Sequence, residues 1–298
     1  MRKVVLLLGA AVMLQQAPPP TEVYLASAGR DVAPSITSAV DISNNPGYDN
    51  QPSFTPDGRA ILFTSNRDGK QTDIYRYDIA TKAIAQITRT PESEYSPIVT
   101  PDGRTFSVIR VEADGTQRLW RFDLDGSNPR VVFENVKPVG YHAWIDATHV
   151  AMFILGANGQ PATLQIGDTA TGGATTIESR IGRALQIRPG VRTLTFVVKP
   201  ASGPWLIKEW DPATKQARTI CETLEGSEDL AWDPVFHDGR LLMAKGSKIF
   251  RWDAASGWRE EGDFAASGID RITRLAVSPD PRAGSANRLA FVAEPRRQ

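Results

Sequence analysis

The residues with the greatest potential for chemistry are His142 and the carboxylates Asp49, Glu94 and Asp229. A histidine can act as a base near neutral pH, and carboxylate oxygens combined with an imidazole nitrogen suit a divalent cation. If these four side chains converge, they can hold a cation or form an acid/base pair. The structural alternative is that His142 packs, hydrogen-bonded and inert, beside Trp144, while the acids are solvated or paired with arginines.

Other motifs that would indicate catalysis are missing from the sequence. It contains no phosphate-binding glycine loop, no paired-cysteine motif and no G-x-S-x-G nucleophile elbow. The remaining histidines, His149 and His237, fall in turn regions that we expect at the opposite end of the fold from His142. The single cysteine, Cys221, cannot form an internal disulfide and is expected on a buried strand.

The composition excludes two classes of partner. The 298 residues carry 34 Lys and Arg against 34 Asp and Glu, and 41% of them are hydrophobic. This balance gives no overall field to hold nucleic acid or an anionic membrane, so neither is an expected partner. At the N-terminus, Arg2 and Lys3 precede an apolar run over residues 4–14, which is too short to span a bilayer. Residues 1–20 are therefore predicted to be an export signal followed by a proline-rich leader, with a weak cleavage site and a periplasmic or secreted destination.

A repeat of about 45 residues organises the rest of the chain. An apolar residue precedes a turn-forming cluster six times, with successive spacings of 45, 45, 43, 45 and 45 residues. These anchors are Phe54, Val99, Trp144, Ile187, Trp232 and Val277. An Asp that ends a strand recurs with similar spacing at Asp78, Asp123, Asp168, Asp211 and Asp253. Four short strands in each repeat, with no helical periodicity, predict an all-β, six-bladed β-propeller of four-stranded blades.

The two ends of the chain support this prediction. The sixth repeat stops after two strands, whereas residues 21–44 supply two strands ahead of the first anchor. We therefore expect the N-terminal strands to complete the last blade and close the ring, which removes exposed sheet edges. The predicted propeller covers 21–298, with blades at about 45–90, 91–135, 136–178, 179–221, 222–267, and 268–298 plus 21–44.

The sequence "TPDGR" occurs twice, at residues 55–59 and 100–104. Proline fixes φ at the first turn position, Asp tolerates the next conformation and Gly accepts a positive φ. The motif is therefore interpreted as turn architecture and not as a catalytic element.

The repeats that begin "PSFTPDGRAILFTSNRDG" and "SPIVTPDGRTFSVIRV" resemble the TolB-like, WD40-like propeller repeat. This resemblance spans roughly residues 22–298 and implies an exported six-bladed propeller that serves as a binding or scaffolding module. TolB itself has an additional N-terminal α/β domain, which we do not expect here because about twenty residues follow the predicted signal before the blades begin. Peptidases that carry the same propeller need an α/β-hydrolase domain, which the sequence also lacks.

In a propeller, the loops before each first strand and between the second and third strands share one face, which we call the channel mouth. The residues expected there as ligand-binding candidates are Asp49, Glu94, Tyr95, Glu112, Tyr141, His142, Arg183, Asp229 and Arg271. The same segments also contain Tyr48, Arg67, Glu228, Asp270 and Arg274. The metal-ligand candidates are Asp49, Glu94, His142 and Asp229, although no cofactor is assigned beyond this cation hypothesis.

Three functions remain open on the sequence. The first is a non-enzymatic envelope module, a monomer or a component of a complex, that binds a protein, peptide or small ligand at the channel mouth. The alternative is a propeller hydrolase, lactonase or lyase with a carboxylate/His or divalent-cation site there. The third is a component of an envelope complex that uses the sides of the blades as its interface. Binding is favoured because no acid/base pair or metal-ligand spacing stands out, and because a fold does not define a function.

Overall fold

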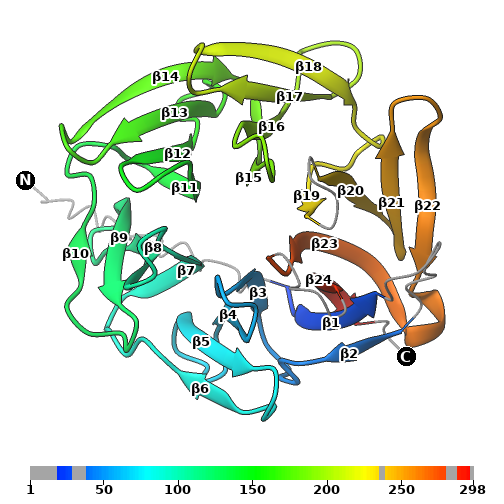
Figure 1. The fold of residues 1–298 in the computed structure, drawn as a ribbon. Coiled ribbons are helices and arrows are strands. Elements are labelled where there is room, and N and C mark those ends of the chain that lie inside the picture. The colour runs from blue at the N-terminus through cyan, green and yellow to red at the C-terminus, as the bar shows by residue number, and fades with distance from the viewer. Residues whose placement is uncertain (1–18, 29–37, 235–238, 280–286, 296–298) are drawn as a thin grey trace, which may run out of the picture.

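The computed structural model describes residues 19–28, 38–234, 239–279 and 287–295, which form six antiparallel four-stranded sheets arranged around a central axis (Figure 1). The predicted six-bladed propeller is confirmed. The one short helical segment among the described residues is a 3₁₀ turn, η1 (Ala265–Ser267). Most of the predicted export signal, residues 1–18, lies outside the described residues.

Each blade runs from an innermost strand beside the axis to an outermost strand at the rim. Blade 1 comprises β3 (Asp49–Phe54), β4 (Ala60–Ser65), β5 (Asp73–Asp78) and β6 (Ile84–Gln86). Blade 2 comprises β7 (Ser93–Val99), β8 (Thr105–Val111), β9 (Gln117–Asp123) and β10 (Arg130–Val131). Blade 3 comprises β11 (Val139–Trp144), β12 (His149–Ile154), β13 (Thr163–Asp168) and β14 (Gly173–Ser179).

The second half of the ring repeats this order. Blade 4 comprises β15 (Ile181–Ile187), β16 (Leu194–Val198), β17 (Leu206–Asp211) and β18 (Gln216–Glu222). Blade 5 comprises β19 (Leu230–Asp233), β20 (Arg240–Lys245), β21 (Lys248–Asp253) and β22 (Gly257–Asp263). Blade 6 combines β23 (Ile269–Val277) and β24 (Asn287–Pro295) with β1 (Glu22–Ala28) and β2 (Ala39–Asp41).

The ring closes by pairing its two ends, as the surplus and missing strands predicted. Strand β1 pairs antiparallel with β24 over seven residues, from Glu22 opposite Ala293 to Ala28 opposite Asn287. Strand β2 then pairs with β1 as the outermost strand of blade 6. Main-chain hydrogen bonds between strands from the two ends of the chain therefore complete blade 6 and hold the ring shut.

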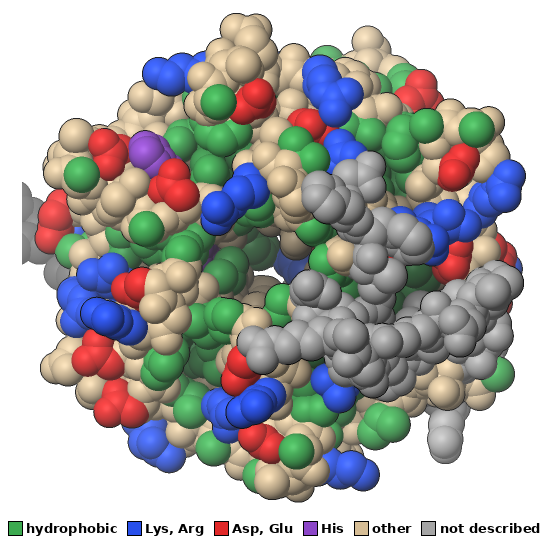
Figure 2. Space-filling view, in the orientation of Figure 1, with side chains coloured by type: hydrophobic (Ala, Val, Ile, Leu, Met, Phe, Trp, Pro, Cys, Tyr) green, Lys and Arg blue, Asp and Glu red, His purple; other side chains and the backbone are tan. Residues whose placement is uncertain are grey.

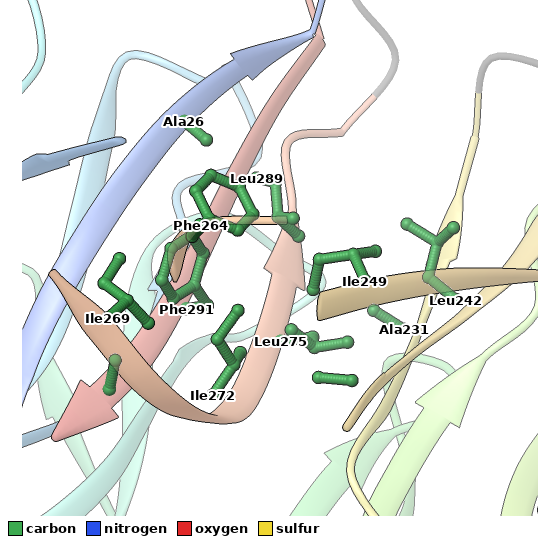
Figure 3. Packing of buried hydrophobic residues seen from close by; sticks show 12 residues of the cluster. Ala26, Ala231, Leu242, Ile249, Phe264, Ile269, Ile272, Leu275, Leu289 and Phe291 are labelled. Carbon is green, nitrogen blue, oxygen red and sulfur yellow. The ribbon is translucent and has the colours of Figure 1, made fainter. Parts of the chain in front are cut away.

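The hydrophobic core lies between the blades. The described buried residues form six clusters, and each cluster joins side chains of two neighbouring blades. At the seam between blades 5 and 6, Leu242 and Ile249 face Phe264, Leu275 and Phe291 (Figure 3). A blade cannot bury its two faces alone, so the complete ring is the stable unit.

Indole hydrogen bonds reinforce two of these seams at equivalent positions. The Trp144 Nε1–H donates to Ser107 Oγ of the preceding blade at 2.9 Å, and the Trp232 Nε1–H donates to Thr195 Oγ1 at 3.0 Å. These anchor tryptophans therefore act in blade-to-blade packing. A buried indole N–H needs such a partner, and the hydroxyl on the neighbouring blade supplies it.

The repeated turn motif has the geometry expected of turn architecture. Thr55 Oγ1 lies 2.6 Å from Asp57 Oδ1, which also accepts from the Arg59 N–H at 3.1 Å, and Gly58 has φ of 66°. In the second copy, Thr100 Oγ1 lies 2.7 Å from Asp102 Oδ1, and Gly103 has φ of 67°. The polar groups of the motif are thus used within their own turns.

Candidate functional site

A set of polar and aromatic side chains, one or more from each blade, meets at the axis of the propeller. We call this set the channel-mouth ring. Its members are Tyr48 and Asn50 from blade 1, Tyr95 from blade 2, Tyr141 from blade 3, Arg183 from blade 4, Asp229 from the segment that enters blade 5, and Arg274 from blade 6. Figure 2 shows the ring of blades hollowed at its centre, with charged side chains spread over the surrounding blades.

Irregularities in the innermost strands aim these side chains toward the axis. The strand register shifts between Asn50 and Ser53, and at the corresponding place between Tyr95 and Ile98. Gln51 and Ser96 adopt positive φ there, at 50° and 54°. A bulge redirects the neighbouring side chains, and a non-glycine residue held at positive φ is a form of backbone strain found at functional sites.

Blade 6 has the same combination of a register shift and a positive φ, at Arg274. Arg274 has φ of 51°, and the register of β23 shifts between Thr273 and Leu275. Its Nη2–H donates to the Tyr141 hydroxyl at 2.7 Å, and its guanidinium carbon lies 4.7 Å from the centre of the Tyr141 ring. Blades 3 and 6 lie on opposite sides of the axis (Figure 1), so the contact between Arg274 and Tyr141 crosses the channel mouth.

Asp229 is held between two arginines. Its Oδ1 accepts from Arg183 Nε at 3.0 Å and from Arg274 Nη1 at 3.1 Å, and its Oδ2 accepts from Arg183 Nη2 at 2.5 Å. Burial acts to raise the pKa of Asp229, but the hydrogen bonds from Arg183 and the charges of both arginines outweigh it and lower that pKa. Asp229 is therefore a carboxylate at neutral pH.

Four of the nine ligand-binding candidates from the sequence meet in this ring: Tyr95, Tyr141, Arg183 and Asp229. Tyr48 and Arg274, from the same segments, also belong to the ring although they are not among the nine candidates. Tyr48 lies edge-on to Tyr95, with ring centres 6.5 Å apart, and its hydroxyl accepts from Gln51 Nε2 at 2.9 Å. Burial raises the pKa of the Tyr48 hydroxyl, so it stays neutral. Asn50 and Arg274 complete the ring through contacts that the repeat pattern alone does not specify.

Asp49 and Glu94 lie inside the protein and away from the ring. Asp49 Oδ2 accepts from Asn45 Nδ2 at 2.8 Å, and Oδ1 lies 3.6 Å from Arg67 Nη2. Glu94 Oε1 accepts from the Thr90 hydroxyl and lies 3.3 Å from Arg110 Nε. Burial raises the pKa of both acids, that of Glu94 to about 7.

Glu112 and Arg271 form pairs on the outside of the ring. Glu112 accepts from Arg118 Nη2 at 2.5 Å and from Trp120 Nε1 at 2.8 Å, and the bonds from Arg118 lower its pKa. Arg271 is 64% exposed and contacts Glu294 at 2.6 Å. Neither side chain is linked to the ring by a contact among the described residues.

His142 lies in the seam between blades 2 and 3. It is 4% exposed, and its Nε2 lies 2.7 Å from Ser107 Oγ, the oxygen that also accepts from the Trp144 indole. Burial lowers the pKa of His142 to about 3, so the ring is neutral. His142 is therefore a buried packing residue beside Trp144, and it is not placed to act as a base at the channel mouth.

The four metal-ligand candidates do not converge. Within residues 19–28, 38–234, 239–279 and 287–295, no group of three or more His, Cys, Asp or Glu side chains is placed to hold a metal ion. Asp49, Glu94 and Asp229 each engage a different arginine partner, at Arg67, Arg110 and Arg183. Cys221 is partly buried, and burial raises its thiol pKa to about 12, so it is no nucleophile at neutral pH.

Comparison with known families assigns the fold. Residues 12–198, more than half of the chain, match the TolB beta propeller domain. The chain belongs to this family. An uncharacterized protein of Agrobacterium fabrum is 28% identical over 108 residues, which cover 33% of this chain and 36% of that protein. TolB of the Tol-Pal system of Bordetella pertussis is 43% identical over 49 residues, which cover 16% of this chain and 10% of TolB.

Solved structures extend the similarity in fold to nearly the whole chain. A structure from Agrobacterium tumefaciens assigned as a TolB has a TM-score of 0.68 at 15% identity, covering 93% of this chain and 99% of that one. An oligogalacturonate lyase in complex with manganese has a TM-score of 0.55 at 14% identity, covering 86% and 80% of the two chains. At these identities the likeness concerns the fold alone, since binding proteins and enzymes share it. In the described residues, no helix is long and apolar enough to cross a membrane.

Proposed function

We propose that this TolB-family propeller is an exported, non-enzymatic binding module of the cell envelope that holds a protein or peptide partner at its channel-mouth ring. The observation that carries the proposal is the composition of the ring: three tyrosines and two arginines, gathered from five of the six blades around one axis. Tyrosine and arginine are the residue types that dominate the binding energy of protein interfaces.

The chemical state of the neighbouring groups also favours binding over catalysis. The one carboxylate in the ring, Asp229, is neutralised by Arg183 and Arg274, and its lowered pKa makes it a weak base. The two acids whose pKa is raised to about 7, Glu94 and Glu22, are buried and bonded to their own neighbours. A general base must reach the proton it removes, and none of these three groups is placed for that.

Export is part of the proposal and rests on the N-terminal sequence. Arg2 and Lys3, followed by the apolar run over residues 4–14, have the pattern of an export signal. The family match to TolB of the Tol-Pal system is consistent with an envelope location. A protein partner in the envelope is therefore the expected occupant of the ring.

Site-specific photo-crosslinking tests this function. We expect p-benzoylphenylalanine at position 95 to capture a discrete envelope protein on irradiation, because Tyr95 belongs to the ring. The matched control is position 124, since Leu124 is 49% exposed and follows the far end of β9, at the opposite end of the same blade. Capture at position 124 and not at position 95 would contradict the proposal.

A further inference from the structure

A chain of alternating charges leads from Lys199, which directly follows β16 of blade 4, into the channel. Lys199 Nζ lies 2.6 Å from Glu228 Oε2, and Glu228 Oε1 lies 3.3 Å from Arg183 Nη1. Arg183 then pairs with Asp229 at 2.5 Å, and Asp229 pairs with Arg274 at 3.1 Å. The chain therefore contains three cations and two anions, with a cation at each end.

The cation at the inner end has neutral partners on its other sides. Arg274 donates to the Tyr141 hydroxyl at 2.7 Å and lies within 3.4 Å of Asn50 Oδ1. Among the described residues, Asp229 is the carboxylate that pairs with Arg274, and it is already shared with Arg183. The inner cation, Arg274, therefore shares its single carboxylate partner with Arg183 and is otherwise in contact with neutral groups.

Nearby carboxylates do not compensate this charge. Asp49 and Glu94, the acids at the starts of β3 and β7, are fully buried and each lies beside its own arginine, Arg67 and Arg110. Arg274, by contrast, keeps 16% of its side chain exposed to solvent. An arginine fork that is partly exposed and incompletely neutralised is a natural site for a carboxylate.

We infer that the ligand of the channel-mouth ring carries a carboxylate group, which binds Arg274 beside Asp229, with the rest of the ligand packed on the tyrosines. This inference rests on the proposed binding function and defines the chemistry of what is bound. Asp229 acts as an internal counter-ion: it holds the guanidinium groups of Arg183 and Arg274 in place, and it also competes with the ligand for Arg274. Removing its charge should therefore strengthen binding of a carboxylate.

The test is calorimetric titration of the full chain with N-acetyltyrosine and with N-acetyltyrosinamide, which differ in the carboxylate, at constant ionic strength. We expect the acid to bind at least tenfold more tightly than the amide. Asp229→Asn should bind the acid at least tenfold more tightly than the unsubstituted protein, whereas Arg274→Gln should weaken it at least tenfold. Arg271→Gln is the matched control, because Arg271 pairs with Glu294 outside the ring, and it should leave binding unchanged.

Each alternative result overturns the inference. Equal affinities for acid and amide, an unaffected Arg274→Gln variant, or no measurable binding of the acid would each contradict it. Inorganic phosphate that binds as tightly with the same dependence on Arg274 would indicate a general anion site and not a carboxylate site. If Arg274→Gln does not fold, Arg274→Lys provides a second variant, because it keeps the positive charge but lacks the guanidinium group that can donate two hydrogen bonds to a carboxylate. It should also weaken binding of the acid.

The two proposals fail separately. If position 95 captures a partner while acid and amide bind equally, the binding function stands and the carboxylate inference is wrong. If the acid binds in the expected pattern while no protein is captured at position 95, the carboxylate site stands and the protein-binding function is wrong.

Discussion

Phe291→Ala is expected to lower the free energy of unfolding by about 3–5 kcal/mol. Phe291 is fully buried on β24, in the blade that closes the ring. Its ring centre lies 4.9 Å from that of Phe264 and 5.6 Å from that of Tyr24, which β1 contributes (Figure 3 shows Phe264 and Phe291). Truncation therefore removes contacts that join the two ends of the chain and leaves a cavity in the seam. Denaturant unfolding followed by circular dichroism measures the change.

Leu124→Ala is the control for this prediction. Leu124 is 49% exposed in a turn, and its truncation should change the free energy of unfolding by less than about 0.5 kcal/mol. If Phe291→Ala were as mild as Leu124→Ala, the ring would not depend on the packing of its closing blade.

Stability is expected to fall as the pH rises from about 4.5 to 7, with Glu94 as one main source. Burial raises the pKa of Glu94 from 4.5 to about 7, with Arg110 opposing the shift and Asp73 adding to it. The folded state therefore binds the proton more tightly than the unfolded state. The protonated carboxyl is buried without penalty at low pH, and the buried carboxylate costs up to about 3 kcal/mol once the pH exceeds the folded pKa.

Glu94→Gln is expected to reduce this pH dependence, because glutamine matches the shape of the protonated side chain and does not ionise. Its melting temperature at pH 7.5 should equal or exceed that of the unsubstituted protein, and the two should converge near pH 4.5. Part of the dependence should remain, because burial also raises the pKa of Glu22, which accepts a hydrogen bond from the Ser43 hydroxyl, to about 7. A melting temperature at pH 7.5 that is lower in Glu94→Gln would show that the carboxylate stabilises the fold.

The architecture follows from the sequence because each blade repeats the same local information. The 45-residue period, the Thr-Pro-Asp-Gly turns and the strand-ending aspartates all depend on local backbone preferences, which a single repeat already expresses. Ring closure was also predictable, since it needs no more than a count of strands at the two ends.

The candidate site was less predictable because adjacent strand residues point to opposite sides. Tyr141 reaches the channel, whereas His142 enters the seam. Tyr95 contacts Tyr48 of the ring and also packs against the cluster between blades 2 and 3, while the adjacent Glu94 lies beside Arg110. Bulges such as the register shift between Val139 and Tyr141 change the alternation near the axis, so spacing from the anchor does not fix the direction of the side chain. The strand alternation does predict the position of His142. It lies two residues before Trp144, so both side chains point to the same side of the strand, where both contact Ser107.

Arg274 required the three-dimensional structure. Its partners Asn50, Tyr141 and Asp229 are 224, 133 and 45 residues away in the sequence, in three other blades. No local pattern encodes a contact across the axis of a ring, because that contact exists only when all six blades are assembled.

The most direct test of the account compares the affinity of the captured partner for Tyr95→Ala and for Glu94→Gln, two adjacent substitutions on opposite sides of β7. If the channel-mouth ring is the binding surface, calorimetry should show Tyr95→Ala binding at least tenfold more weakly, while Glu94→Gln stays within twofold of the unsubstituted protein. Loss of binding in Glu94→Gln with full affinity in Tyr95→Ala would contradict the account and restore the acids as the functional groups.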